Sequence, residues 1–119
     1  MAAEKAEIPV EYGNLTGQYF TQWRVDALLD LLQLIVYCYS TTPLVEIADV
    51  KIWYDAEEDF HRMSFYAPVT GHSMAVRLYK VWTCEVDNVV TWQGCPRHMV
   101  GEFAKHLRDQ MRIETSTTT

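Results

Sequence analysis

The sequence has few of the residues that mark several classes of protein. Its 119 residues include only three cysteines, Cys38, Cys84 and Cys95. An odd number with wide spacing does not form a disulfide framework. The five glycines and four prolines are scattered, which excludes collagen-like and low-complexity chains. No apolar run approaches the roughly 20 residues of a membrane span, so we expect no membrane segment.

Basic residues are also scarce. Lys and Arg together number 10 against 16 Asp and Glu, which gives a net charge of −6. A basic segment followed by an apolar one is missing at the N-terminus, so we expect no secretory signal. Free thiols then predict a reducing compartment, the cytoplasm or the nucleus. An acidic chain is a poor general binder of nucleic acid, because phosphate contacts need Lys and Arg.

What the sequence does contain is typical of one packed domain. It is 49% hydrophobic and 13% aromatic, and its length fits a single core. We expect a flexible N-terminal arm over residues 1–18 with a short extended piece over residues 8–12, a single α+β domain over residues 19–113, and a disordered tail over residues 114–119.

Two segments have helical periodicity. Residues 19–39 carry apolar side chains at spacings of three and four, at Phe20, Trp23, Ala27, Leu31 and Ile35. A last helix opens at the sequence Gly-Cys-Pro of residues 94–96, because proline suits a first turn. Its expected buried stripe is Val100, Phe103, Leu107 and Met111.

Between these helices the sequence predicts strands over residues 44–54, 60–67, 73–86 and 89–92. The apolar phase of the first strand shifts by one residue at Ala48 and Asp49, which predicts a bulge or a break there. Asp87 and Asn88 are typical of a tight turn. Hairpin-length connections favour an antiparallel meander. The expected fold class is therefore α+β with two layers, in the order helix, three or four antiparallel strands, helix.

This order resembles the topology of double-stranded RNA-binding domains. In that family the last helix begins with a lysine-rich stretch that binds phosphates, and the matching residues 95–99 here contain one basic residue, Arg97. The resemblance implies an RNA-binding module that uses the last helix. Its possible nucleic-acid contacts are Arg97, Lys105, Arg108 and Arg112.

The aromatic residues point to a different function. If two helices cover one sheet face, the other face carries Trp53, Tyr66, Tyr79 and Val81. Aromatic patches are typical of protein interfaces. Our leading hypothesis is a non-enzymatic protein-interaction module that forms a homodimer through these four residues. The acidic turn of Asp55, Glu57, Glu58 and Asp59 is expected to steer a basic partner.

A third hypothesis is a small enzyme or ligand-binding protein with a cavity between the long helix and the sheet. Cys95 lies before the last helix, where a helix N-terminus lowers the pKa of a thiol. A nucleophile also needs a base and an orienting group, which the sequence does not identify. His98, Glu102 and His106 share one helix side, but their spacing is not that of a zinc motif. We therefore predict no catalytic residue, metal or cofactor.

Overall fold

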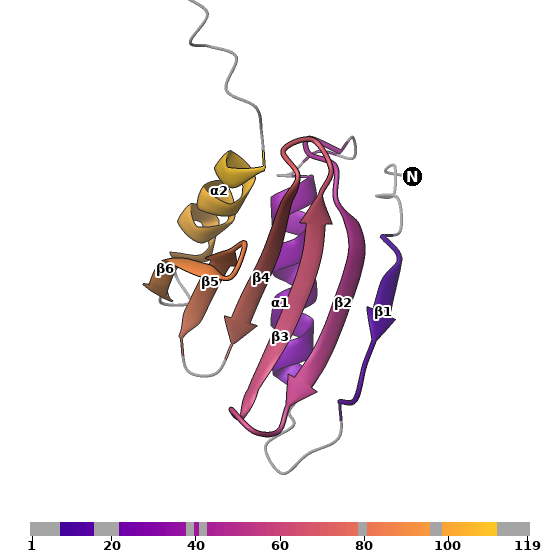
Figure 1. Ribbon diagram of the computed structural model, residues 1–119, viewed down its shortest axis with the longest axis vertical. Helices are drawn as coiled ribbons and strands as arrows, with labels where there is room; N and C mark the ends of the chain where they lie inside the picture. The colour runs from indigo at the N-terminus through magenta and orange to yellow at the C-terminus, as the bar shows by residue number, and fades with distance from the viewer. Residues whose placement is uncertain are drawn as a thin grey trace, which may run out of the picture.

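The computed structural model describes residues 8–15, 22–37, 40, 43–78, 81–95 and 99–111. Figure 1 shows these residues as one curved sheet with two helices. The elements in chain order are β1 (Val10–Tyr12), α1 (Gln22–Val36), β2 (Ala48–Asp55), β3 (Phe60–Ala67), β4 (His72–Leu78), β5 (Trp82–Val86), β6 (Val89–Cys95) and α2 (Val100–Gln110).

The six strands lie side by side in the order in which they occur along the chain. β1 pairs in parallel with β2, and every other pair is antiparallel. The expected order of helix, three or four antiparallel strands and helix is therefore wrong. The sheet has six strands, one of them precedes the first helix, and the sheet is the dominant element. The order on which the resemblance to double-stranded RNA-binding domains depends is not present.

The error has two physical causes. β1 is only three residues long and lies within the piece expected to be extended over residues 8–12, which was placed in the N-terminal arm and not in the sheet. The expected long strand over residues 73–86 is a hairpin, with Leu78 opposite Trp82. The three intervening residues include no glycine, proline, asparagine or aspartate. They also preserve the alternating phase, because Leu78 and Trp82 are both buried on one side of the sheet.

Local backbone signals are confirmed. The register of β2 against β3 shifts by one residue between Ala48 and Lys51, and Asp49 has a φ of 57°. This is the bulge that the phase shift predicts. Asp87 and Asn88 have φ values of 51° and 70°, as a two-residue type I′ turn requires, and they connect the pair Val86 and Val89.

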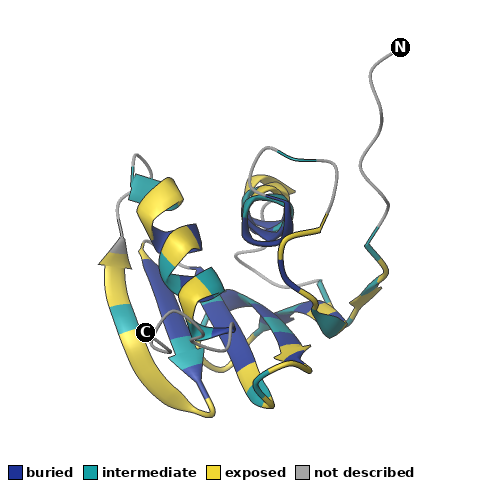
Figure 2. Ribbon diagram, turned by 90° about the horizontal axis from the view of Figure 1, so that it is seen from above, coloured by how far each residue is buried: buried dark blue, intermediate teal, exposed yellow. Residues whose placement is uncertain are grey.

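Both helices cover the same face of the sheet, as Figure 2 shows from above. The sheet contributes its alternate inward residues to the core, among them Ile52, Met63 and Val76, all fully buried. α1 buries Leu28, Leu31, Leu32 and Ile35 against them. Its expected stripe is wrong at Trp23, whose side chain is 46% exposed, while the neighbouring Arg24 is buried.

α2 begins at Val100 instead of residue 94, because β6 continues to Cys95. Its buried stripe is confirmed at Phe103, Leu107 and Met111, and Val100 is half-buried. The Phe103 ring packs against those of Trp82 and Trp92, at centroid distances of 5.6 Å and 5.7 Å. Neither described helix is long and apolar enough to cross a bilayer.

The type I′ turn between β5 and β6 can be tested by substitution at Asn88. We expect Asn88→Val to lower the free energy of unfolding by about 1–2 kcal/mol, because a β-branched side chain is strained at positive φ. Asn88→Gly is the matched control and should leave stability close to wild type. Chemical denaturation of both variants is the measurement. A Val variant as stable as the Gly variant would contradict the type I′ geometry.

Candidate functional site on the open face of the sheet

The face of the sheet turned away from α1 and α2 is called the open face here. Alternation places on it every second residue of the four central strands. Its central residues are Lys51, Trp53, Phe60, Arg62, Ser64, Tyr66, Ser73, Ala75, Arg77, Thr83 and Glu85. The face therefore combines aromatic rings, three cations, small residues and one carboxylate.

An ion-pair network crosses the centre of this face. Arg62 on β3 and Arg77 on β4 lie directly opposite each other in the register. Glu85 on β5 binds both, with its Oε1 atom 3.2 Å from Arg62 Nη2 and its Oε2 atom 2.8 Å from Arg77 Nη2. All three side chains are largely shielded from solvent, which makes this pairing stronger than a surface ion pair.

The same cations cover the aromatic rings. The guanidinium of Arg62 lies 5.6 Å from the Trp53 ring centroid, and Lys51 Nζ lies 5.4 Å from it. Arg77 is 5.2 Å from the ring of Phe60. These are cation–π distances. The open face is thus a mixture of stacked cations and rings, and not the bare aromatic patch that the sequence suggested.

The four residues expected at an interface are only partly brought together. Trp53, half-buried, and Tyr66, 39% exposed, both lie on the open face. Val81 is exposed but sits in the turn between β4 and β5, beyond the ends of the strands. Tyr79 lies outside the described residues. Val81 lies off the strands because β4 ends at Leu78 and β5 begins at Trp82, where one long strand was expected.

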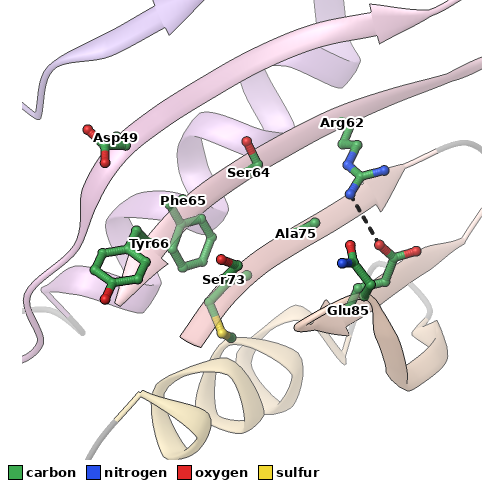
Figure 3. A pocket seen from close by; sticks show the side chains of 10 residues that line it. Asp49, Arg62, Ser64, Phe65, Tyr66, Ser73, Ala75 and Glu85 are labelled. Carbon is green, nitrogen blue, oxygen red and sulfur yellow. Dashed lines mark hydrogen bonds and ion pairs between the residues drawn. The ribbon is translucent and has the colours of Figure 1, made fainter. Parts of the chain in front are cut away.

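A hollow of about 250 Å³ opens on this face. Figure 3 shows Asp49 and Tyr66 at one end, the Arg62–Glu85 ion pair at the other, and Ser64, Ser73 and Ala75 between them. Its lining residues are Asp49, Arg62, Ser64, Phe65, Tyr66, Ser73, Met74, Ala75, Glu85 and Asn88. We call it the open-face hollow. It lies on the opposite side of the sheet from the expected cavity between the long helix and the sheet.

The acidic turn has a structural role. Asp55 Oδ1 accepts hydrogen bonds from the backbone N–H groups of Glu57 and Glu58, each at 3.0 Å. The Tyr54 hydroxyl donates to Asp59 Oδ1 at 2.6 Å. Two of the four expected acidic contacts therefore hold the β2–β3 turn together. Glu57 and Glu58 remain as exposed carboxylates.

The residues expected to form sites around α2 are only partly within the described residues. Lys105 is exposed and Arg108 half-buried, while Arg97, His98 and Arg112 lie outside the described residues. His106 Nε2 lies 3.0 Å from Thr91 Oγ1 on β6, and its ring is 5.2 Å from that of Trp92. No group of described side chains could hold a metal ion. Cys95 is the last residue of β6, and α2 begins at Val100.

His61 is a buried polar residue to which the sequence assigned no role. It lies on the helix-covered face, fully buried, with its ring 5.0 Å from that of Tyr54. Burial lowers the pKa of His61, the positive charge of Arg24 lowers it further, and Asp59 opposes this shift. The imidazole is therefore held in its neutral form.

Arg62, Arg77 and Glu85 were not predicted from the sequence as functional residues. Each falls in the polar phase of an expected strand, which was the available signal. Their meeting depends on the register of three strands, and that register is not visible in a single sequence.

No protein-family model, curated protein or solved structure matches the chain.

The buried imidazole predicts a pH dependence of stability. The pKa of His61 lies below its usual value of 6.5, so the unfolded chain binds more protons at mildly acidic pH. The free energy of unfolding should therefore fall as the pH is lowered from about 7.5 to about 5. Urea denaturation across this range is the measurement.

Two variants test whether His61 is the group responsible for this pH dependence. His61→Gln should flatten this pH dependence, whereas His72→Gln, at a half-exposed histidine, should retain it. An unchanged pH profile in His61→Gln would show that another group is responsible.

Proposed function

We propose that this chain is a non-enzymatic protein-interaction module that self-associates through the open face of its sheet. The observation that carries the proposal is the gathering of Trp53, Tyr66, Arg62 and Arg77 on one face. Tryptophan, tyrosine and arginine are the residue types most enriched among the energetic centres of protein interfaces. Here they occur on one face, and two of them, Arg62 and Tyr66, line a surface hollow.

The preorganisation of this face supports the same function. Long arginine side chains normally lose rotamer freedom when an interface forms. Arg62 and Arg77 are already held by Glu85 and by stacking on Trp53 and Phe60. Much of the side-chain entropy of these arginines has therefore been lost on folding, so less is lost when a partner binds.

The distribution of charge favours a second copy as the partner. Arg62 lies at one end of the open-face hollow and Asp49 at the other, as Figure 3 shows, and Arg77 is the register partner of Arg62 on β4. Arg62 and Tyr66 are about 13 Å apart along β3, at about 3.3 Å per residue. A twofold axis in the plane of contact, perpendicular to the strands, reverses this polarity. It places the cationic end of each copy on the aromatic and acidic end of the other.

The proposal includes a reducing compartment, for which the thiol of Cys84 is the evidence. Cys84 is fully buried and unpaired, and burial raises the pKa of its thiol. A buried neutral thiol is a structural residue that a reducing compartment preserves. We place the module in the cytoplasm or nucleus on this ground.

Light scattering on a sizing column tests self-association. We expect a wild-type dimer, and a folded monomer for Trp53→Ala combined with Tyr66→Ala, because this pair removes the aromatic anchors of the interface. Trp23→Ala is the control, since it removes an exposed tryptophan from α1, away from the open face, and should remain dimeric. Circular dichroism verifies that each variant is folded. A wild-type monomer, or a dimeric double variant, overturns the proposal.

Opposite charges at Ser73 test the arrangement of the two copies. Ser73 is exposed at the acidic end, so the proposed axis places it against Arg77 of the second copy. Ser73→Glu should therefore tighten the dimer and Ser73→Lys should weaken it, each by about 2- to 5-fold in Kd at low salt. Equal effects of both variants would rule out this arrangement of charges.

A further inference from the structure

We infer that the open-face hollow binds a neutral, hydroxyl-rich ligand about the size of one sugar ring. The inference goes beyond the proposed function, because it concerns a small molecule and holds whether or not the chain self-associates. It rests on the balance of charge in the hollow, on its hydrogen-bonding groups and on its size.

The charges around the hollow cancel. Asp49 and Glu85 line it with Arg62, and Glu85 is bound by Arg77 as well. Arg77 lies outside the lining but neutralises Glu85, so the two carboxylates are balanced by two guanidiniums. A charged ligand would gain little attraction from such a site and would lose its hydration. A neutral ligand avoids that loss.

The walls nevertheless offer many hydrogen bonds. Arg62 lines the hollow with a side chain that is 25% exposed, and a guanidinium carries five N–H donors, of which the bond to Glu85 uses one. The carboxylate of Asp49 forms no ion pair or hydrogen bond with the described side chains. Ser64 and Ser73 add hydroxyl groups that both donate and accept. A ligand with several hydroxyl groups can use donors and acceptors of this kind together, which an apolar ligand cannot.

The aromatic ring at one end of the hollow and the small residues at its base limit the shape of a ligand that fits. Tyr66 presents a 39% exposed ring at one end of the hollow, and the apolar C–H face of a sugar ring can pack on such a ring. Ala75, Ser64 and Ser73 have small side chains, which leaves the base of the hollow open. The volume of about 250 Å³ is below the usual range for drug-sized ligands, so a single ring fits best.

The hollow shares Tyr66, Arg62 and Asp49 with the proposed self-association surface. A ligand bound in it therefore competes with a second copy. If both inferences hold, saturating ligand converts the dimer to the monomer. If the chain is monomeric at every concentration, self-association fails while binding to the hollow is still measurable.

Amide chemical shifts of the full chain test the inference, with methyl α-D-glucopyranoside as the neutral probe. Glucose 6-phosphate and glucosamine are the anionic and cationic counterparts. We expect saturable shifts at Tyr66, Ser73 and Ala75 with a Kd in the millimolar range, since a ligand of about 13 heavy atoms is seldom tighter. Both charged probes should bind several-fold more weakly. The absence of saturable shifts at these residues, or tighter binding of either charged probe, overturns the inference.

Two variants connect the shifts to the hollow. Ala75→Leu raises the floor and should weaken the neutral probe by at least about 10-fold. Asp49→Asn keeps a residue type that tolerates the φ of 57° and removes one negative charge. It should weaken the neutral probe by about 3- to 10-fold and strengthen glucose 6-phosphate relative to wild type.

Asp30→Asn is the matched control, because it removes the same charge from an exposed position on α1. It should change neither affinity. If Asp30→Asn and Asp49→Asn have equal effects, the response reflects the overall charge of the protein, and the site in the hollow is refuted.

Discussion

The open face of the sheet depends on the carboxylate of Glu85. The register of β3 and β4 places Arg62 directly opposite Arg77, and like charges in this position destabilise a sheet. Glu85 reaches both from β5 and turns a repulsive pair into a three-residue network. The arginines held in this way lie over Trp53 and Phe60, so the order of the aromatic rings depends on the same carboxylate.

The two faces of the sheet are stabilised by different interactions. One is covered by α1 and α2 and is stabilised by buried apolar side chains, at the cost of enclosing Arg24 and His61. The other has no described helix over it, and its own long cations shield its rings. A surface of this kind is ordered without being apolar. It therefore suits reversible contacts, whether with a second copy or with a small polar ligand.

The proposed self-association and the proposed ligand site have one physical origin. Small residues at Ser64, Ser73 and Ala75 leave the middle of the open face low, while Tyr66 and Arg62 rise on either side. The raised ends provide contacts for a partner, and the low centre provides room for a ring. Competition between the two follows from this shape, because the same side chains form both the rim and the wall.

The sequence alone determined the features that depend on near neighbours. The bulge at Asp49, the turn at Asp87 and Asn88, and the buried stripe of α2 were all predicted, because each reflects the preferences of a few adjacent residues.

Only the tertiary structure decided the number of strands, the place of Val81 and the meeting of Arg62, Arg77 and Glu85. Three residues separate β4 from β5 and preserve the alternating phase along the sequence, so two strands looked like one. Cross-strand partners depend on pairing between segments distant in the chain. A one-residue change of that pairing would separate the three charges while leaving every local pattern unchanged.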